Sequence, residues 1–190
     1  MMPHKLTVKV GAPRFQPLDS ARVLESFHTW ISESALPEIL VDAADYRHMR
    51  NGPGIVLVGH ESNYYFGEHR GQFALSCFRK RSSNDGMHAL GDVLVRVLRA
   101  CELLQQSLSE STDMFDTSTL DVSIADRLVT KLPTFNMGDF LVWVQEYLER
   151  IYECAPSIHV SMGAGLPTVR AQCSPRPLHA LRARAQEHLS

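Results

Sequence analysis

The sequence predicts an α+β protein of one domain, with helices packed on a mixed or largely antiparallel sheet. Three observations support this class. Apolar residues alternate in several short segments, they recur at helical spacing in longer ones, and short polar links join three strands in succession. The 190 residues are 44% hydrophobic and 21% charged, which suits a globular core. The expected element order is β-α-β-β-β-α-β-α-β, followed by a tail.

The N-terminal part predicts a strand, a helix and a three-stranded meander. Residues 5–10 (KLTVKV) alternate apolar and polar side chains, as a half-buried strand does. A helix should begin at Asp19 or Ser20, either of which can cap it, and end at Pro37. Its apolar stripe consists of Val23, Leu24, Phe27, Trp30 and Ile31. Short links then separate three strands, which should pair antiparallel, at 38–46, 54–66 and 72–81.

The C-terminal part alternates helices and strands. In order, the pattern predicts a helix over 87–108, a strand over 119–126, a helix after Pro133 and a strand over 157–162. No internal repeat is visible, so we expect one domain over 1–165 and a C-terminal tail over 166–190. This tail ends in a short basic amphipathic helix near 178–189. Two interpretations stay open for it: a helix that docks on a partner or second subunit, and a mobile terminus.

Composition narrows the class of function. The net charge is −2, which gives no electrostatic drive toward nucleic acid or an anionic membrane. The four cysteines are scattered and form no C-x-x-C pair, so we expect reduced thiols in a soluble, cytoplasmic protein. A membrane span needs about 20 apolar residues, and neither such a run nor a signal peptide is visible. No motif identifies a cofactor, which stays unknown.

Polar residues are densest around the Gly-Pro-Gly at 52–54. Five of them are ligand types for a hard or borderline metal: Asp42, Asp45, His48, His60 and Glu61. If the flanking strands form a hairpin, paired positions sum to about 100, so Asp45 lies near Ile55 and His60 near Leu40. These two ends are about 17 Å apart. We therefore expect no metal site within one subunit, whereas a site across a dimer interface stays open.

His60 and Glu61 are the candidate catalytic residues. If 54–66 pairs with 72–81, positions sum to about 138, which places Glu61 opposite Cys77 and diagonal to Arg79. A cross-strand Glu–Arg ion pair and a packed histidine are then the structural interpretation, which we favour. In the functional interpretation, His60 is a general acid or base that a neighbouring carboxylate orients.

Two further groups are candidate binding residues. Arg79, Lys80 and Arg81 stand at a strand end before a predicted helix, where cations and backbone N–H groups can bind an anion. A solvated loop is the alternative. Tyr64 on the preceding strand suits a ligand if it is exposed. A polar cluster at the turn end of the first hairpin consists of Asp45, Tyr46 and His48.

The run VDAADYRHMRNGPGIVLVGHESNYYF resembles a family of uncharacterised bacterial proteins with the pattern D-x-x-D-Y-x-H, G-P-G and G-H-E. The resemblance implies no activity and assigns no role to any residue. Two hypotheses remain. We favour a non-catalytic module that forms a homo-oligomer and binds a protein partner or a small ligand. The alternative is a small enzyme that uses His60 and Glu61 as acid and base or as metal ligands, with further residues from a second subunit.

Overall fold

The structure, a computed structural model, describes residues 3, 5–69, 71–80, 86–108, 114–126, 128–162 and 166–189. These residues contain one eight-stranded sheet, in the order β2-β3-β4-β5-β1-β6-β8-β7. The strands are β1 (Leu6–Gly11), β2 (Leu40–Asp45), β3 (Ile55–Gly59), β4 (Ser62–His69), β5 (Gln72–Arg79), β6 (Asp116–Ile124), β7 (Ser157–Ser161) and β8 (Thr168–Gln172). The α-helices are α1 (Ser20–Glu33), α2 (Gly86–Ser107), α3 (Met137–Tyr152) and α4 (Leu178–Glu187). All neighbouring strands are antiparallel, which confirms the predicted α+β class.

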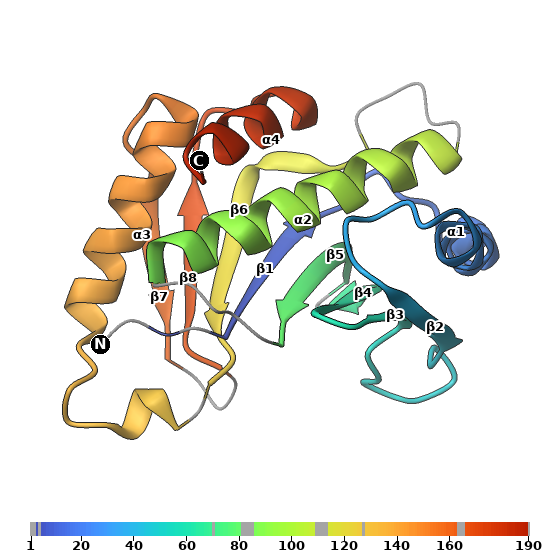
Figure 1. Ribbon diagram of the computed structural model, residues 1–190, viewed down its shortest axis with the longest axis horizontal. Coiled ribbons are helices and arrows are strands. Elements are labelled where there is room, and N and C mark those ends of the chain that lie inside the picture. Colours follow the sequence, from blue (N-terminus) through green and yellow to red (C-terminus); the bar gives the residue numbers. More distant parts are fainter. Residues whose placement is uncertain are drawn as a thin grey trace.

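The helices pack on one face of the sheet (Figure 1). α1 lies on β2 and β3, α2 crosses β1 and β5, and α4 packs on α2. Strand side chains alternate accordingly. On β1, Leu6, Val8 and Val10 are fully buried, whereas Thr7 and Lys9 on the opposite face are partly exposed. We call this opposite face, which carries polar side chains on β1, β6 and β8, the open face.

The predicted strand 54–66 is two strands, because the chain reverses at His60 and Glu61 between β3 and β4. From Asp42 to Asp45 the β2–β3 register is the predicted one, with Asp45 opposite Ile55. A register shift between Leu40 and Asp42 places Leu40 opposite Gly59 instead of His60. The next register differs: paired positions of β4 and β5 sum to 141, so Tyr64, not Glu61, lies opposite Cys77. The polar interruption GHES within the apolar segment is the sequence signal for this turn.

The C-terminal segment is integrated into the sheet and the helical layer. Its strand β8 lies between β6 and β7, although the sequence pattern predicts no strand there. The helix α4 buries Leu181 and Ala185 against the core. In addition, Arg182 pairs with Glu102 of α2, with 2.9 Å between Nε and Oε2. The predicted basic helix therefore docks within its own chain.

The topology contains two similar halves. In the first, β1, α1, β4, β5 and α2 follow one another, and β5 lies between β1 and β4 in the sheet. In the second, β6, α3, β7, β8 and α4 follow one another, and β8 lies between β6 and β7. The β2–β3 hairpin is inserted into the first half, between α1 and β4. The antiparallel pair of β1 and β6 joins the halves at the centre of the sheet.

Candidate functional site

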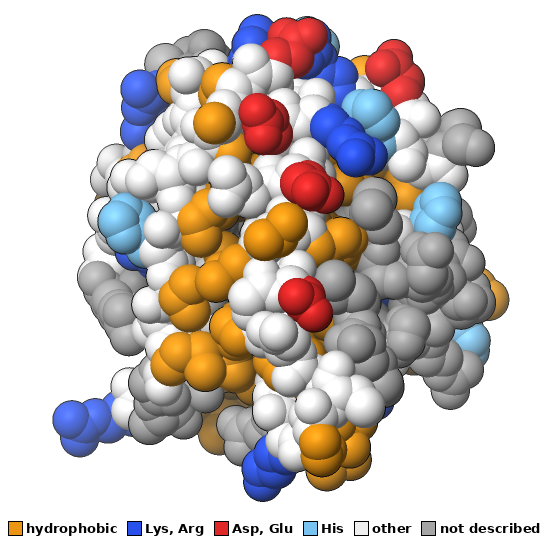
Figure 2. Space-filling view, turned by 90° about the vertical axis from the view of Figure 1, so that its left-hand side faces the viewer, with side chains coloured by type: hydrophobic (Ala, Val, Ile, Leu, Met, Phe, Trp, Pro, Cys, Tyr) orange, Lys and Arg blue, Asp and Glu red, His pale blue; other side chains and the backbone are white. Residues whose placement is uncertain are grey.

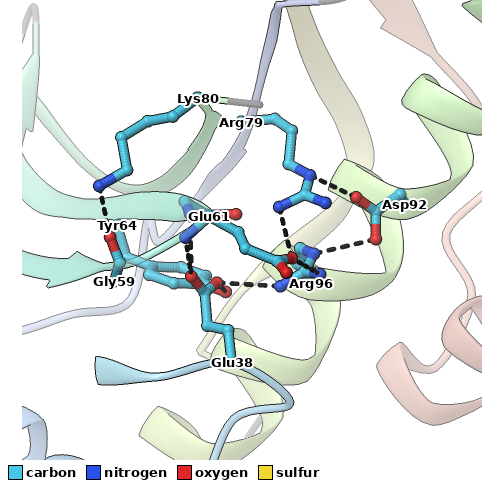
Figure 3. Close-up of polar contacts among 9 residues, drawn as sticks. Glu38, Gly59, Glu61, Tyr64, Arg79, Lys80, Asp92 and Arg96 are labelled. Carbon is cyan, nitrogen blue, oxygen red and sulfur yellow. Dashed lines mark hydrogen bonds and ion pairs between the residues drawn. The ribbon is translucent and has the colours of Figure 1, made fainter. Parts of the chain in front are cut away.

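Two of the predicted site residues, Glu61 and Arg79, meet in a charged cluster between the sheet and α2 (Figure 3). We call it the ionic cluster, and its members are Glu38, Glu61, Arg79, Asp92 and Arg96. The Glu38 side chain is fully buried. Its Oε2 accepts the backbone N–H groups of Glu61 and Ser62 at 2.8 and 2.9 Å, and its Oε1 accepts the Tyr64 hydroxyl at 2.9 Å. One carboxylate thereby fixes the reversal between β3 and β4.

Gly59 makes room for this carboxylate. A Cβ at Gly59 would lie 2.4 Å from Glu38 Oε2 and 2.9 Å from the Ser62 carbonyl oxygen. Lys80 supports the same turn from β5, because its Nζ donates to the Gly59 carbonyl and its backbone N–H donates to Glu61 O at 2.9 Å. The GHES turn is therefore bonded on one side to Glu38, in the segment before β2, and on the other side to Lys80, directly after β5.

Two arginines connect the three carboxylates of the ionic cluster. Arg96 of α2 donates to Glu38 at 2.9 Å, to Glu61 at 2.7 Å and to Asp92 at 2.9 Å. Arg79 of β5 donates to Glu61 at 2.8 Å and lies 2.5 Å from Asp92. Both guanidinium groups are largely buried, and such cations require paired carboxylates. The cluster therefore ties the segment before β2, the β3–β4 turn and β5 to α2.

The electrostatics favour a structural role for this cluster. The hydrogen bond from Arg79, reinforced by Arg96, holds the pKa of the Glu61 carboxyl below its usual value, so this group stays ionised at neutral pH. Nearby, burial raises the pKa of the Cys77 thiol to about 12, which disfavours a reactive thiolate. The Glu61–Arg79 pair of the structural interpretation is thus present, while acid–base chemistry at Glu61 stays a prediction.

The other candidates from this region have different surroundings. The His60 side chain is exposed, and its backbone N–H donates to Ile39 O at 2.8 Å. Tyr64 is completely buried, and burial raises the pKa of its hydroxyl well above the ordinary value. Arg79 pairs with the carboxylates of Glu61 and Asp92, and the Lys80 ammonium donates to the Gly59 carbonyl. Both cations therefore already have partners within the chain. Arg81 lies outside the described residues, so the anion site predicted at this strand end stays untested.

The turn-end residues lie at the far end of the β2–β3 hairpin, as the predicted register requires. Asp45 accepts two hydrogen bonds from the Arg47 guanidinium, which together with the Arg47 backbone N–H lower the pKa of its carboxyl to about 2. Tyr46 and His48 are exposed, and their ring centroids are 6.5 Å apart. Over the described ranges, no three His, Cys, Asp or Glu side chains gather closely enough to hold a metal ion.

A second charged group, which no sequence motif marks, lies on the open face. Lys9, Asp121 and Arg170 occupy neighbouring positions on β1, β6 and β8, and we call them the charged triad. Arg170 donates to both Asp121 oxygens, at 2.7 and 2.9 Å, and Lys9 Nζ lies 3.0 Å from Oδ2. The side chain of Asp121 is 7% exposed, whereas that of Arg170 is 51% exposed. A buried carboxylate therefore holds two cations that extend toward solvent.

The charged triad carries one net positive charge. Burial raises the pKa of the Asp121 carboxyl, but the hydrogen bonds from Arg170 and Lys9 outweigh this effect and bring the pKa below its usual value. Asp121 is therefore ionised at neutral pH. Its bonds use Nε and Nη2 of Arg170, so the N–H groups of Nη1 are not engaged by Asp121.

The charged triad borders a hollow of about 460 Å³, the open-face hollow, whose lining also includes Gly11, Ala74 and Gln172. An adjoining hollow of about 230 Å³ shares Lys9 and Ala74 and extends to Tyr65 and Gly67. Small residues account for this space: a Cβ at Gly11 would meet no heavy atom within 4 Å. The two adjoining hollows are thus lined by the cations Lys9 and Arg170, by amide groups and an aromatic ring, and also by the carboxylates Asp116, Asp121 and Glu68.

The sequence contains only part of the signal for this site. Lys9 and Asp121 occupy outward positions in alternating segments that are predicted as strands, so their exposure to the open face is foreseeable. Arg170 lies in β8, which is not predicted, and the order β1-β6-β8 follows from no local pattern. The meeting of the three residues is therefore a result of the tertiary structure.

Comparisons with known proteins find no matching family model, no matching curated protein and no matching solved structure. A search of the described helices for one that is long and apolar enough to span a lipid bilayer finds none.

Proposed function

We propose that this protein is a non-catalytic binding module, and that its open-face hollow binds a small molecule carrying a phosphate or carboxylate group. The observation that carries the proposal is the charged triad at the border of this hollow. Asp121 orients both cations from a buried position, so a ligand finds them already placed. Preorganised cations of this kind lower the entropic cost of binding an oxyanion.

The donor set favours an oxyanion. Asp121 does not engage the two N–H donors at Nη1 of Arg170, and Lys9 has further ammonium protons beyond the one facing Asp121. Guanidinium and ammonium groups form their strongest hydrogen bonds with phosphate and carboxylate oxygens. Since Asp116 and Glu68 line other parts of the two hollows, the anionic group of the ligand should contact the triad, which carries one positive charge.

The dimensions favour a small ligand. Pockets for small molecules commonly measure about 300–1,000 Å³, and the open-face hollow with its extension falls in this range. Tyr65 at one end supplies an apolar surface for the body of the ligand. Over the whole chain the net charge is −2, which disfavours a long polyanion such as RNA.

A binding role has more support than the enzyme hypothesis. In the ionic cluster, Glu61 is engaged by two arginines, and His60 is exposed away from the open-face hollow. In the hollow, the carboxylate of Asp121 is likewise held ionised by its partners. Neither Glu61 nor Asp121 is therefore suited to exchange a proton near neutral pH, which general acid–base catalysis needs.

Titration of the isotopically labelled protein, followed by NMR, tests the proposal. The probes are inorganic phosphate, ribose 5-phosphate and succinate, which separate phosphate from carboxylate recognition and reveal any contribution of the ligand body. We expect saturable shifts at amides near Lys9, Asp121 and Arg170. Arg170→Gln should weaken binding about tenfold or more, because it removes a charge-assisted contact.

Arg184→Gln is the matched control, because Arg184 lies on α4, pairs with Glu153 and is remote from the open-face hollow in sequence and fold. Its binding should equal that of the unmodified protein. Thermal unfolding checks that both variants are folded. The proposal is overturned if none of the three probes gives saturable shifts at millimolar concentration, or if Arg170→Gln and Arg184→Gln bind equally.

A further inference from the structure

The strand β7 is an edge of the sheet with an open outer side. Among the described strands it pairs with β8 alone, and its residues are exposed except for the half-buried Ile158. The topology explains this position. In the first half of the molecule the corresponding strand, β4, has its outer side covered by β3 of the inserted hairpin. The second half has no such insertion, so the backbone donors and acceptors on the outer side of β7 face no strand of the described chain.

β7 is short, with five residues, and follows Pro156, but it lacks several other features by which monomeric proteins protect an edge. Such edges carry charged side chains, a proline or a bulge that prevents pairing. β7 reads Ser-Ile-His-Val-Ser, without a carboxylate, lysine, arginine or proline, and its pairing with β8 shows no register shift. The other edge, β2, differs: it carries Asp42 and Asp45 and has a register shift between Leu40 and Asp42. The two edges of one sheet are thus unequally protected.

Apolar side chains accompany the open edge. Val160 and Met162 on and after β7 are 42% and 64% exposed, and Val142 on the neighbouring helix α3 is 56% exposed. Figure 2 shows the side of the molecule that carries α3 and β7, and apolar side chains gather in the middle of this face. A contiguous apolar patch beside an unpaired strand is typical of a protein interface.

We propose that β7 pairs with β7 of a second copy of this chain, antiparallel about a two-fold axis, and extends the two sheets into one. The composition of β7 indicates that its partner strand is β7 of a second copy. Paired with its own copy, β7 meets a strand without carboxylate, lysine or arginine, and the backbone donors and acceptors of the two strands complement each other. Pairing of β7 with β2 would instead create an open-ended chain of subunits and use the protected edge.

The dimer has a consequence for the open face. His159 lies beside Arg170 in the β7–β8 register, on the open-face side of the sheet. A two-fold axis near β7 therefore places both copies of the charged triad on the same face of one continuous sheet. The proposal does not depend on ligand binding, since it rests on the strand edge, the patch and the topology.

Light scattering coupled to size-exclusion chromatography, over a series of concentrations of the full chain, tests the proposal. We expect a reversible dimer whose fraction rises with concentration. Val160→Lys places a charge on the edge and should give a monomer, as edge lysines do in natural sheets. Val41→Lys is the matched control: it introduces the same charge at an exposed valine on the β2 edge, and the dimer should persist.

Hydrogen exchange provides a second measurement that needs no variant. Amides of β7 should exchange more slowly at high than at low protein concentration, while those of β2 should be unaffected. The proposal is overturned by a monomer at all concentrations. It is also overturned if Val41→Lys dissociates the dimer and Val160→Lys does not, or if the added protection appears on β2.

Discussion

At Gly59, a side chain would compete with a buried carboxylate for the same space, since a Cβ there would lie 2.4 Å from Glu38 Oε2. We expect Gly59→Ala to lower the free energy of unfolding by about 1–3 kcal/mol. Either the carboxylate moves away from the N–H groups of Glu61 and Ser62, or the β3–β4 turn shifts. Urea denaturation followed by circular dichroism measures the change.

Gly11→Ala is the control for this substitution. A Cβ at Gly11 would meet nothing within 4 Å, and Gly11 does not have the left-handed backbone conformation that disfavours alanine. Its effect should stay within about 0.5 kcal/mol, as for most surface changes. Equal losses in the two variants would show that the Glu38 carboxylate does not explain Gly59.

The charge of Glu38 can be tested separately from its size. Glu38→Gln keeps the shape, but it removes one of the three carboxylates that Arg96 contacts, the fully buried one, and turns an amide NH2 toward hydrogen-bond donors. Breaking a buried ion pair costs about 3–5 kcal/mol. Because Arg96 keeps Glu61 and Asp92, we expect a loss near the lower end, about 3 kcal/mol, in chemical denaturation. Glu153→Gln, which removes an exposed partner of Arg184, should leave the midpoint unchanged. Similar shifts in both variants would refute the special role of the buried site.

Single residues differ in how far the sequence predicts their partners. The Glu61–Arg79 pair is foreseeable because Glu61 directly precedes β4, which a short link joins to β5 and its Arg79. It forms even though the register differs from the predicted one. Glu38 and Arg96 are 58 positions apart. Their contact depends on how α2 crosses the sheet, which helical periodicity does not specify.

Elements whose apolar residues recur with a clear helical or strand period are predicted correctly. Elements whose sequence lacks such a period, or runs into that of a neighbour, are missed or merged. α2 and β1 have a regular apolar stripe or alternation and form as expected. β3 and β4 read as one strand because both are apolar, and only the short GHES interruption separates them. β8 carries Arg170 in its centre and follows a proline, so local composition favours a loop.

Docking of α4 is testable at the level of the element. Leu181 is buried in the core, so Leu181→Ala should destabilise the protein by about 2–5 kcal/mol. Leu128→Ala is the control, since Leu128 is 75% exposed and its loss should be within about 0.5 kcal/mol. Urea denaturation compares the two. A C-terminal helix that behaves as a mobile terminus would give the same small effect at both positions.

For the whole molecule, the two halves explain where the polar sites lie. The ionic cluster belongs to the first half and ties its inserted hairpin to α2. The charged triad crosses the junction, with Lys9 from the first half and Asp121 and Arg170 from the second. Strand order creates this second site, and strand order is the property that local sequence patterns constrain least.

Three carboxylates, one in the ionic cluster, one in the charged triad and one at the turn end of the β2–β3 hairpin, give the whole molecule a defined pH dependence. The folded protein holds the pKa of Asp45, Glu61 and Asp121 below their usual values, near 2 for Asp45. In the unfolded chain these groups titrate at about 4. Between these values the unfolded state binds more protons than the folded state. The stabilisation is therefore present above about pH 4 and is lost as the pH falls through the folded-state values.

Denaturation at a series of pH values from 7 down to about 3 should show this dependence, with a plateau above pH 5 and a steep fall below pH 4. Asp121→Asn should be less stable at neutral pH, because Lys9 and Arg170 lose the anion between them. Its decline in acid should also be shallower, because one depressed carboxyl no longer takes up a proton on unfolding. Parallel curves for the two proteins would mean that Asp121 titrates equally in the folded and unfolded states. The charged triad would then not hold its carboxylate ionised, and the preorganisation on which oxyanion binding depends would be lost with it.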